Sequence, residues 1–326
     1  MSISDDHVAR LIEVARAYYM DNQTQADIAR RLGISRSMVS RELTLAREMG
    51  IIDIRIKDPR DTLTAHGQRL ICLFPHLLDA VIAPTFSEEP DAVRAMIGRA
   101  AANYLIGHLK PGQRLALGCG RTLRAVVDAL PRQPVPGIEI VQAMGNIGHE
   151  AHGIDYNEIA RRAADALSGR AYYVSAPAIL GKRAGSASGF IEANPVLSHA
   201  LSLAQQADVV AVGLGSLESD QLYAQAGLID SDELDTLRGR AVGDICGRFF
   251  DLNGGEVIAP FAGRTIGITL QDLRRTPMSI GIAGGADKVE PLLGALRGER
   301  INILITDELT VRRLLEIAED NSKEVT

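Results

Sequence analysis

The spacing of apolar residues divides the chain into two parts. Over residues 6–48 apolar side chains recur every three or four positions, which places them on one face of a helix. From about residue 61 short apolar runs alternate with longer helical stretches, an alternation typical of a parallel sheet covered by helices on both faces. The sequence therefore predicts a helical domain over 1–57, a linker over 58–62 and an α/β domain over 63–326.

The helical part carries the start and stop signals of three helices. A first helix is expected over residues 6–20. Thr24 is placed to cap a second helix, and Asp27 favours the positive end of that helix. Gly33 is the residue type that ends helices in a left-handed conformation, and Ser35 then caps a third helix. Two short helices joined by a tight glycine turn predict a helix-turn-helix.

The third helix has two distinct faces when residues 36–48 are projected at about 100° per residue. Its apolar stripe is predicted to contain Met38, Val39, Leu43 and Ala46. Small hydroxyl side chains on the opposite face let a helix enter the major groove of DNA, and arginines there reach guanine edges or phosphates. The predicted DNA-binding residues are Thr24, Gln25, Ser35, Arg36, Ser37, Ser40 and Arg41.

A simpler explanation is that the arginines at positions 30, 31, 36 and 41 form a solvated helix face. The spacing of Ala29, Gly33 and Val39 favours DNA binding, because it matches two closely crossing helices. The alternating residues 51–57 predict a small strand, or wing, after the third helix. Proline at position 59 favours a linker directly after this strand.

The α/β part contains five predicted strands, over residues 114–118, 138–144, 209–215, 279–285 and 301–307. Three of them end in glycines, namely Gly118 and Gly120, Gly213 and Gly215, and Gly284 and Gly285. Ligands bind beyond the carboxyl ends of parallel strands, where glycine lets backbone N–H groups converge and a following helix favours an anion. We therefore expect one ligand site at this edge of the sheet.

Polar residues at these joints are placed to hold a phosphate or sugar hydroxyls: Arg121, Thr122, Ser216 and Lys288. Any one glycine joint is also explained by packing alone, so the prediction depends on the whole set. Asp244 either binds a hydroxyl or is a solvated cap. Cys119 lies in the first joint without a nearby histidine and is interpreted as a small apolar filler.

Other chemistries are poorly supported by the sequence. No joint completes the dinucleotide pattern G-x-G-x-x-G. His149, Glu150 and His152 invite a metal site, but they lack the histidine pair of HExxH, so neither a metal nor a cofactor is predicted. Among five lysines only Lys288 lies at a glycine joint, and no nucleophile–base pair is evident by spacing. This pattern favours binding over catalysis.

The overall charge does not indicate a general polyanion binder. The net charge is −6, and residues 1–57 carry nine basic against eight acidic side chains, so the positive groups act through local placement. No apolar run approaches the ~20 residues of a membrane-spanning helix. The N-terminal ten residues do not resemble a secretory signal, and three scattered cysteines suggest a reducing cytoplasm.

The ordered motifs resemble those of the SorC family of bacterial transcriptional regulators. They are TQADIARRLGISRSMVSREL, AREMGII, GCGRTL, VVAVGLGSL, AVGDICGRFFD, IAGGADK and INILITDELT. The resemblance implies a winged helix-turn-helix and a Rossmann-like effector domain related to sugar-phosphate isomerases and deaminases. It also implies a homo-oligomer, a dimer or commonly a tetramer, that controls carbohydrate genes in response to a sugar or phosphosugar.

The same resemblance implies effector contacts in the three glycine loops and at the end of the strand before Ala143. The full predicted set is Gly118, Gly120, Arg121, Thr122, Gln142, Gly213, Gly215, Ser216, Asp244, Gly284, Gly285 and Lys288. Cys119 departs from the family, since many members carry a bulkier residue there. Two other classes stay open: a sugar-phosphate isomerase or deaminase with an accessory DNA-binding segment, and an RNA or protein adaptor.

Overall fold

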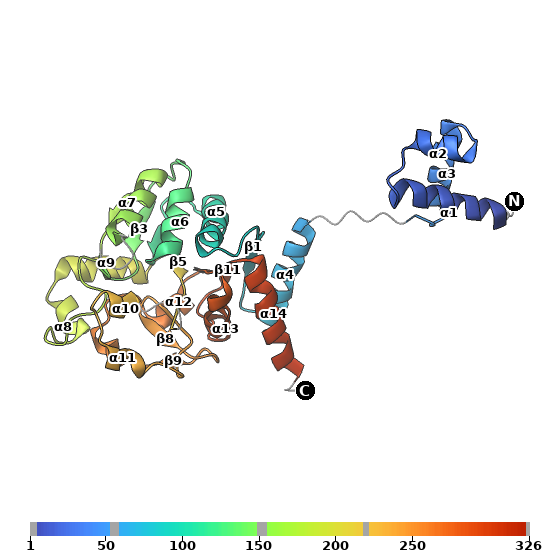
Figure 1. Ribbon diagram of the computed structural model, residues 1–326. Coiled ribbons are helices and arrows are strands. Elements are labelled where there is room, and N and C mark those ends of the chain that lie inside the picture. The colour runs from blue at the N-terminus through green and yellow to red at the C-terminus, as the bar shows by residue number, and fades with distance from the viewer. Residues whose placement is uncertain (1–4, 53–58, 149–154, 218–221, 324–326) are drawn as a thin grey trace. The chain divides into compact units, whose positions relative to one another are not determined.

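The computed structural model describes residues 5–52, 59–148, 155–217 and 222–323, and it divides into two compact units, Met1–Asp58 and Pro59–Thr326 (Figure 1). The first unit contains the helices α1 (Asp5–Tyr19), α2 (Gln25–Leu32) and α3 (Arg36–Glu48). Its core consists of Val14, Ala17, Ile28, Ala29, Val39 and Leu43.

The predicted signals at the ends of α2 and α3 are present. Thr24 and Asp27 form a reciprocal capping box at the start of α2, and Gly33 ends that helix with φ of 66°. The Ser35 hydroxyl accepts a hydrogen bond from the Met38 N–H at 3.2 Å and caps α3. The α2–turn–α3 arrangement is therefore confirmed as a helix-turn-helix.

One face of α3 differs from the sequence prediction. Met38 is 44% exposed, whereas Glu42 is only 3% exposed. Glu42 lies three positions after Val39 on the inward face, and its carboxylate pairs with Arg10 Nε of α1 at 2.7 Å. The spacing of apolar residues cannot predict a buried charged residue whose partner lies on another helix. Of the predicted wing, residues 53–57 lie outside the described residues.

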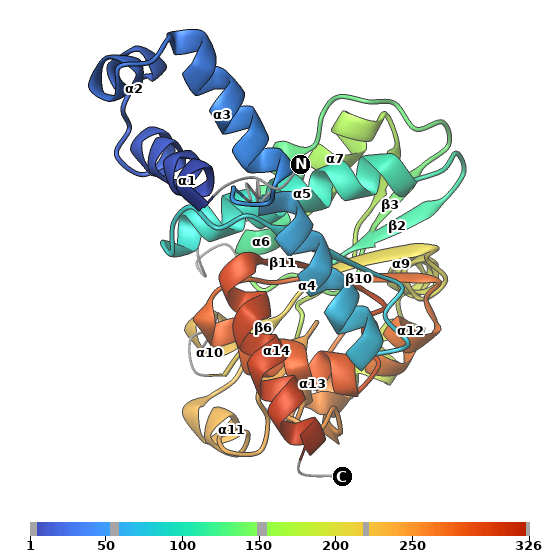
Figure 2. The same cartoon turned by 90° about the vertical axis from the view of Figure 1, so that its right-hand side faces the viewer.

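A helix occupies most of the segment that was expected to be a linker. Helix α4 (Pro59–Leu73) begins at the proline, because proline is favoured at the first position of a helix, where its missing N–H is not needed. It lies beside α14 (Glu308–Lys323), and Arg69 Nε donates to Glu319 Oε1 at 3.1 Å (Figures 1 and 2).

The second unit contains a seven-stranded parallel sheet in the order β1-β11-β10-β5-β2-β3-β4. Its strands are β1 (Asp79–Ala83), β2 (Arg114–Leu117), β3 (Glu139–Gln142), β4 (Arg170–Tyr172), β5 (Val209–Gly213), β10 (Met278–Ile282) and β11 (Ile303–Asp307). The five predicted strands are confirmed, and the edge strands β1 and β4 are additional.

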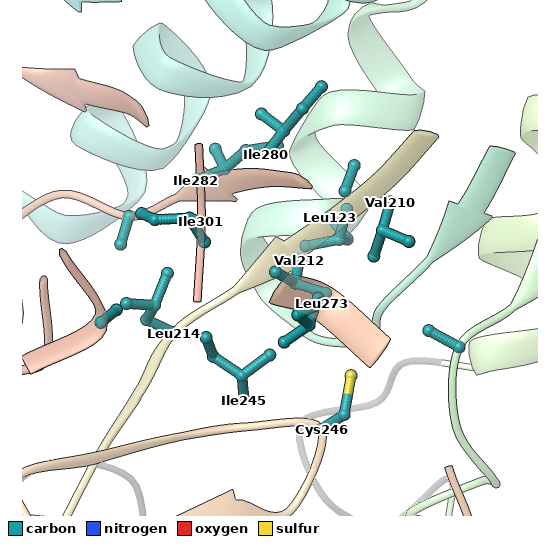
Figure 3. Packing of buried hydrophobic residues seen from close by; sticks show 14 of the residues in the cluster. Leu123, Val210, Val212, Leu214, Ile245, Cys246, Leu273, Ile280, Ile282 and Ile301 are labelled. Atoms are coloured by element: carbon teal, nitrogen blue, oxygen red, sulfur yellow. The ribbon is translucent and has the colours of Figure 1, made fainter. Parts of the chain in front are cut away.

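Helices cover both faces of this sheet. Figure 1 shows α5 (Pro90–His108), α6 (Arg121–Ala129) and α7 (Tyr156–Leu167) on one side, with α9 (Pro195–Gln205) and α13 (Val289–Arg297) on the other. The core around β5 includes Val210, Val212, Leu123 and Ile280 (Figure 3). The predicted α/β class is confirmed.

A small antiparallel sheet follows β5, in the order β6-β7-β8-β9. It consists of β6 (Gly215–Ser216), β7 (Gly243–Ile245), β8 (Arg248–Phe250) and β9 (Glu256–Val257). The remaining elements are short: α8 (Ala187–Glu192), α10 (Leu222–Gln225), α11 (Ser231–Asp235), α12 (Leu270–Arg275), η1 (Ala262–Arg264) and η2 (Ala286–Lys288). Within the described ranges, no helix has the length and apolar character required to span a membrane.

Candidate functional site

The exposed face of α3 carries most of the residues predicted to bind DNA. Arg36, Ser37, Ser40 and Arg41 are exposed, while Val39 is buried in the helical core. Thr24 and Ser35 are exposed and use their hydroxyls as helix caps, and Gln25 is half-buried at the start of α2.

The four arginines of this segment fall into two groups. Arg30 is paired with Asp27, and Arg31 lies 3.5 Å from the Glu13 carboxylate. Arg36 and Arg41 have no ion pair among the described residues. The residues predicted to bind DNA included Arg36 and Arg41 but neither Arg30 nor Arg31, and the ion pairs of the described residues divide the four arginines in the same way.

A cavity of about 450 Å³ lies in the second unit at the carboxyl ends of β2, β5 and β10, three neighbouring strands. The chain leaves β2 toward β3 and β5 toward β10, in opposite directions, so this is the crevice where open α/β sheets bind ligands. The predicted residues that line it are Gly118, Gly120, Arg121, Thr122, Gly213, Gly215, Asp244, Gly284, Gly285 and Lys288.

Two predicted residues do not line this cavity. The Gln142 amide donates to Asn157 Oδ1 at 3.1 Å and accepts from the Val174 N–H at 2.7 Å, so it joins β3 to its neighbours. Ser216 is buried in β6, which pairs with β7, and it borders a smaller hollow beside Phe249. Ser216 directly follows the cavity residue Gly215, whereas Gln142 ends β3, a strand that contributes no residue to the cavity.

The cavity also contains polar residues that the sequence did not suggest: Glu88, Arg94, Tyr223 and Asp287. Arg94 comes from α5, which has no glycine joint and gave no local signal. Its side chain is 18% exposed and pairs with Asp91. This hydrogen bond, together with the nearby positive charge of Arg121, lowers the pKa of the Asp91 carboxyl.

The cations of the cavity lie on two sides of β5. Arg121 stands at the β2 side, where α6 begins directly after Gly120 without a side-chain cap, and Arg94 reaches the cavity from α5, which packs against α6. Lys288 stands at the β10 side, with its ammonium 3.2 Å from the Asp287 carboxylate. A helix N-terminus beside two guanidinium groups is suited to an anion such as phosphate.

Asp244 is held rigidly between the two sheets. Its Oδ2 accepts from the Tyr223 hydroxyl at 2.8 Å and from the Gly247 N–H at 2.9 Å. A Cβ at Gly215 would lie 2.0 Å from Oδ1, so only glycine admits the carboxylate there. Burial and the adjacent Asp244 charge raise the pKa of Tyr223 well above its usual value, which keeps its hydroxyl a donor.

Two thiols, of Cys119 and Cys246, complete the inner wall. Burial raises the pKa of Cys246 to about 12 and that of Cys119 well above its usual value, so both are neutral near pH 7. Cys119 Sγ lies 3.2 Å from Met144 Sδ, which agrees with its interpretation as a filler. Within the described ranges no group of three His, Cys, Asp or Glu side chains is arranged for a metal, and positions 149–152 lie outside them.

Comparison with known proteins identifies the family. A family model for sugar-binding domains matches residues 61–316. The sorbitol operon regulator of Klebsiella pneumoniae is 32% identical over 97% of this chain and 100% of its own length. The crystal structure of that full-length regulator, SorC, superposes with a TM-score of 0.72 at 31% identity and covers 96% of this chain. The chain belongs to the SorC family of transcriptional regulators.

A second relative widens the range of regulated genes within the family. The deoxyribonucleoside regulator of Bacillus subtilis is 33% identical over 93% of this chain and 96% of its own length. Both relatives are named as regulators. This SorC-family chain is therefore a transcriptional regulator with a sugar-binding domain, and not a sugar-phosphate isomerase or deaminase.

Proposed function

We propose that this regulator binds operator DNA through α3 and that a phosphosugar in the cavity of the second unit controls that binding. The observation that carries the proposal is the convergence of three glycine-ended strands on one cavity that holds Arg94, Arg121 and Lys288. Cations beside a helix N-terminus favour phosphate over a neutral sugar.

Each wall of the cavity has a distinct role in this proposal. The phosphate binds the N–H groups that open α6 and the guanidinium of Arg121, with Arg94 behind it. Asp244 accepts a hydrogen bond from a sugar hydroxyl, since its carboxylate lines the cavity and Tyr223 fixes its orientation. The neutral thiols face carbon atoms of the ring, because they are weak hydrogen-bond donors.

On the DNA side, Arg36 and Arg41 contact bases or phosphates while Ser37 and Ser40 keep the helix surface low enough for the major groove. We further propose that the protein acts in the cytoplasm as a homo-oligomer, a dimer or a tetramer. A pair of recognition helices would then read half-sites about one helical turn apart. The effector changes DNA affinity only through different affinities for two subunit arrangements.

A DNA-binding titration tests the proposal. Fluorescence anisotropy with DNA from the protein's own promoter measures affinity alone and with ribose 5-phosphate, deoxyribose 5-phosphate, fructose 6-phosphate or fructose 1,6-bisphosphate. At least one of these should shift the DNA affinity, and its unphosphorylated sugar should act at least about tenfold more weakly. Equal potency of sugar and phosphosugar would overturn the phosphate assignment, and absence of specific DNA binding would overturn the regulatory one.

A further inference from the structure

A buried carboxylate outside the cavity holds one of its walls. Asp307 is the last residue of β11 and is 1% exposed. Its Oδ1 accepts from the N–H groups of Leu309 and Thr310, both at 3.0 Å, so Asp307 caps the N-terminus of α14. The same oxygen accepts from the Thr85 hydroxyl at 3.3 Å.

The second oxygen of Asp307 faces the loop Gly284–Lys288, which forms the β10 wall of the cavity. The Gly285 N–H donates to Oδ2 at 3.0 Å and to Thr310 Oγ1 at 2.8 Å. A Cβ at Gly284 would lie only 2.5 Å from that oxygen. The loop therefore packs directly against the Asp307 carboxylate.

We propose that Asp307 is a positioning residue that fixes the Gly284–Lys288 loop for the effector and ties it to the first turn of α14. A helix cap alone needs one acceptor, which serine or asparagine supplies equally well. The second oxygen of Asp307 accepts from the Gly285 N–H and also from the Thr310 hydroxyl, so it joins the loop to the first turn of α14. The part of this inference that concerns the effector rests on the proposed function.

Contacts inside the second unit connect Asp307 and α14 to α4, the helix that directly follows the first unit in the chain. Helix α14 lies along α4 through Arg69 and Glu319, and α4 begins at Pro59, the first residue after the DNA-binding unit. A loop movement that accompanies effector binding would therefore reach the α14–α4 pair through Asp307. Packed secondary elements can carry such coupling, and α14 contacts both the loop, through Thr310, and α4, through Glu319.

The substitution Asp307→Asn separates the two roles. Asparagine caps helices as well as aspartate does, so its oxygen stays with α14 and its NH2 group meets the Gly285 N–H, donor against donor. Thr306→Val is the matched control, because Thr306 is buried in the same strand and its hydroxyl has no hydrogen-bond partner in the described part of the chain.

Hydrogen–deuterium exchange on the full-length, ligand-free protein is the measurement. Asp307→Asn should speed exchange of the peptide around Gly285 by about tenfold or more, while the interior of α14 keeps its wild-type rate. Thr306→Val should leave both unchanged. Wild-type exchange at Gly285 in a folded Asp307→Asn protein, or equal acceleration along all of α14, would overturn the assignment.

The four phosphosugars of the DNA titration then probe the effector part. At least one of them should slow exchange in the Gly284–Lys288 loop and in the first turn of α14 in the wild type, because its sugar extends from the phosphate toward the β10 wall, and Asp307→Asn should weaken its apparent affinity about tenfold. Unchanged affinity for that phosphosugar in the variant would overturn the link to the effector. If none of the four protects either region of the wild type, the proposed phosphosugar site fails, while the ligand-free exchange still decides whether Asp307 positions the loop.

Discussion

Two loops on either side of β5 have nearly the same backbone and different surroundings. Gly120 has φ of 108° and ψ of 175°, and Gly285 has φ of 108° and ψ of 159°. Each stands at the start of a helical turn. In the described part of the chain, a Cβ at Gly120 would meet no heavy atom within 4 Å. A Cβ at Gly285 would lie 3.1 Å from the Asp287 carboxylate, and one at the preceding Gly284 would lie 2.5 Å from Asp307 Oδ2.

The same sequence signal, a glycine at the end of a strand, has a different physical cause in each loop. In the first loop, α6 begins after Gly120 without a side-chain cap, and Arg121 follows at the cavity. In the second, the Gly285 N–H is already bonded to Asp307 and Thr310, and Lys288 shares its charge with Asp287. We infer that the first loop contributes more to effector binding and the second more to stability.

The largest effect is expected from the position before each left-handed glycine. Gly284→Ala should lower the free energy of unfolding by about 2–3 kcal/mol, because the new Cβ meets Asp307 Oδ2 and must displace the loop. Cys119→Ala, at the matching position of the other loop, should cost about 1 kcal/mol for its lost contacts. Urea midpoints measure both.

Gly263→Ala controls for the general effect of replacing a glycine by alanine. A Cβ at this position would meet no atom within 4 Å, and the φ angle of Gly263 is not positive. It should stay within about 0.5 kcal/mol of the wild type. Similar losses at Gly284 and Cys119 would remove the distinction between the loops.

The next effect concerns the cations of the two loops. Arg121→Met should weaken binding of the phosphosugar found active in the DNA titration by about 10–100-fold, because charge-assisted hydrogen bonds are worth about 1.5–3 kcal/mol. Lys288→Met should weaken it less, since Asp287 already offsets that charge. Isothermal titration calorimetry measures both affinities.

Arg124→Met serves as the control, because Arg124 is on the same helix but is paired with Asp128 at 2.9 Å. Its effector affinity should equal that of the wild type. A larger loss for Lys288→Met than for Arg121→Met would reverse the proposed roles of the loops.

The arginines of α2 and α3 also differ, because those of α2 lie in ion pairs and those of α3 have no ion pair among the described residues. Arg41→Ala should weaken operator binding by about 1–3 kcal/mol if this side chain reads a base, and should relax specificity there. Arg30→Ala should have a smaller effect, because Arg30 is paired with Asp27. Anisotropy titrations on operator and scrambled DNA distinguish the two, and equal losses would contradict the assignment.

The sequence predicted best those elements whose stabilising contacts lie within a few positions along the chain. Thr24, Gly33 and Ser35 are capping residues whose partners lie within a few positions, so α2 and α3 were recognisable. The five central strands have four or five mostly apolar residues each and were recognisable too, whereas the equally long edge strand β1 was missed. Strands β6 to β9 have two or three residues each, too few for a period to appear.

The cavity was only partly predictable, for the same reason. Glycine joints and parallel topology located its three strand ends, but Arg94 arrives from a helix far from any joint. The sequence also did not show why residue 284 must be glycine. The reason is the side chain of Asp307, which ends the neighbouring strand β11 and was not a predicted site residue. Long-range contacts of this kind leave no mark in the local sequence.

The smallest expected effect is chemical and concerns Cys119 in the first loop. Burial raises the pKa of this thiol, and only the thiolate reacts, so iodoacetamide should label Cys119 slowly at pH 8 and faster at each higher pH. Exposed Cys72 should be labelled first and serves as the internal reference. Because Cys119 lines the cavity, a bound phosphosugar should slow its labelling further and leave Cys72 unaffected. Peptide mass spectrometry follows both sites. Fast, ligand-independent labelling of Cys119 at pH 8 would mean that the first loop is open to solvent rather than shaped around a ligand.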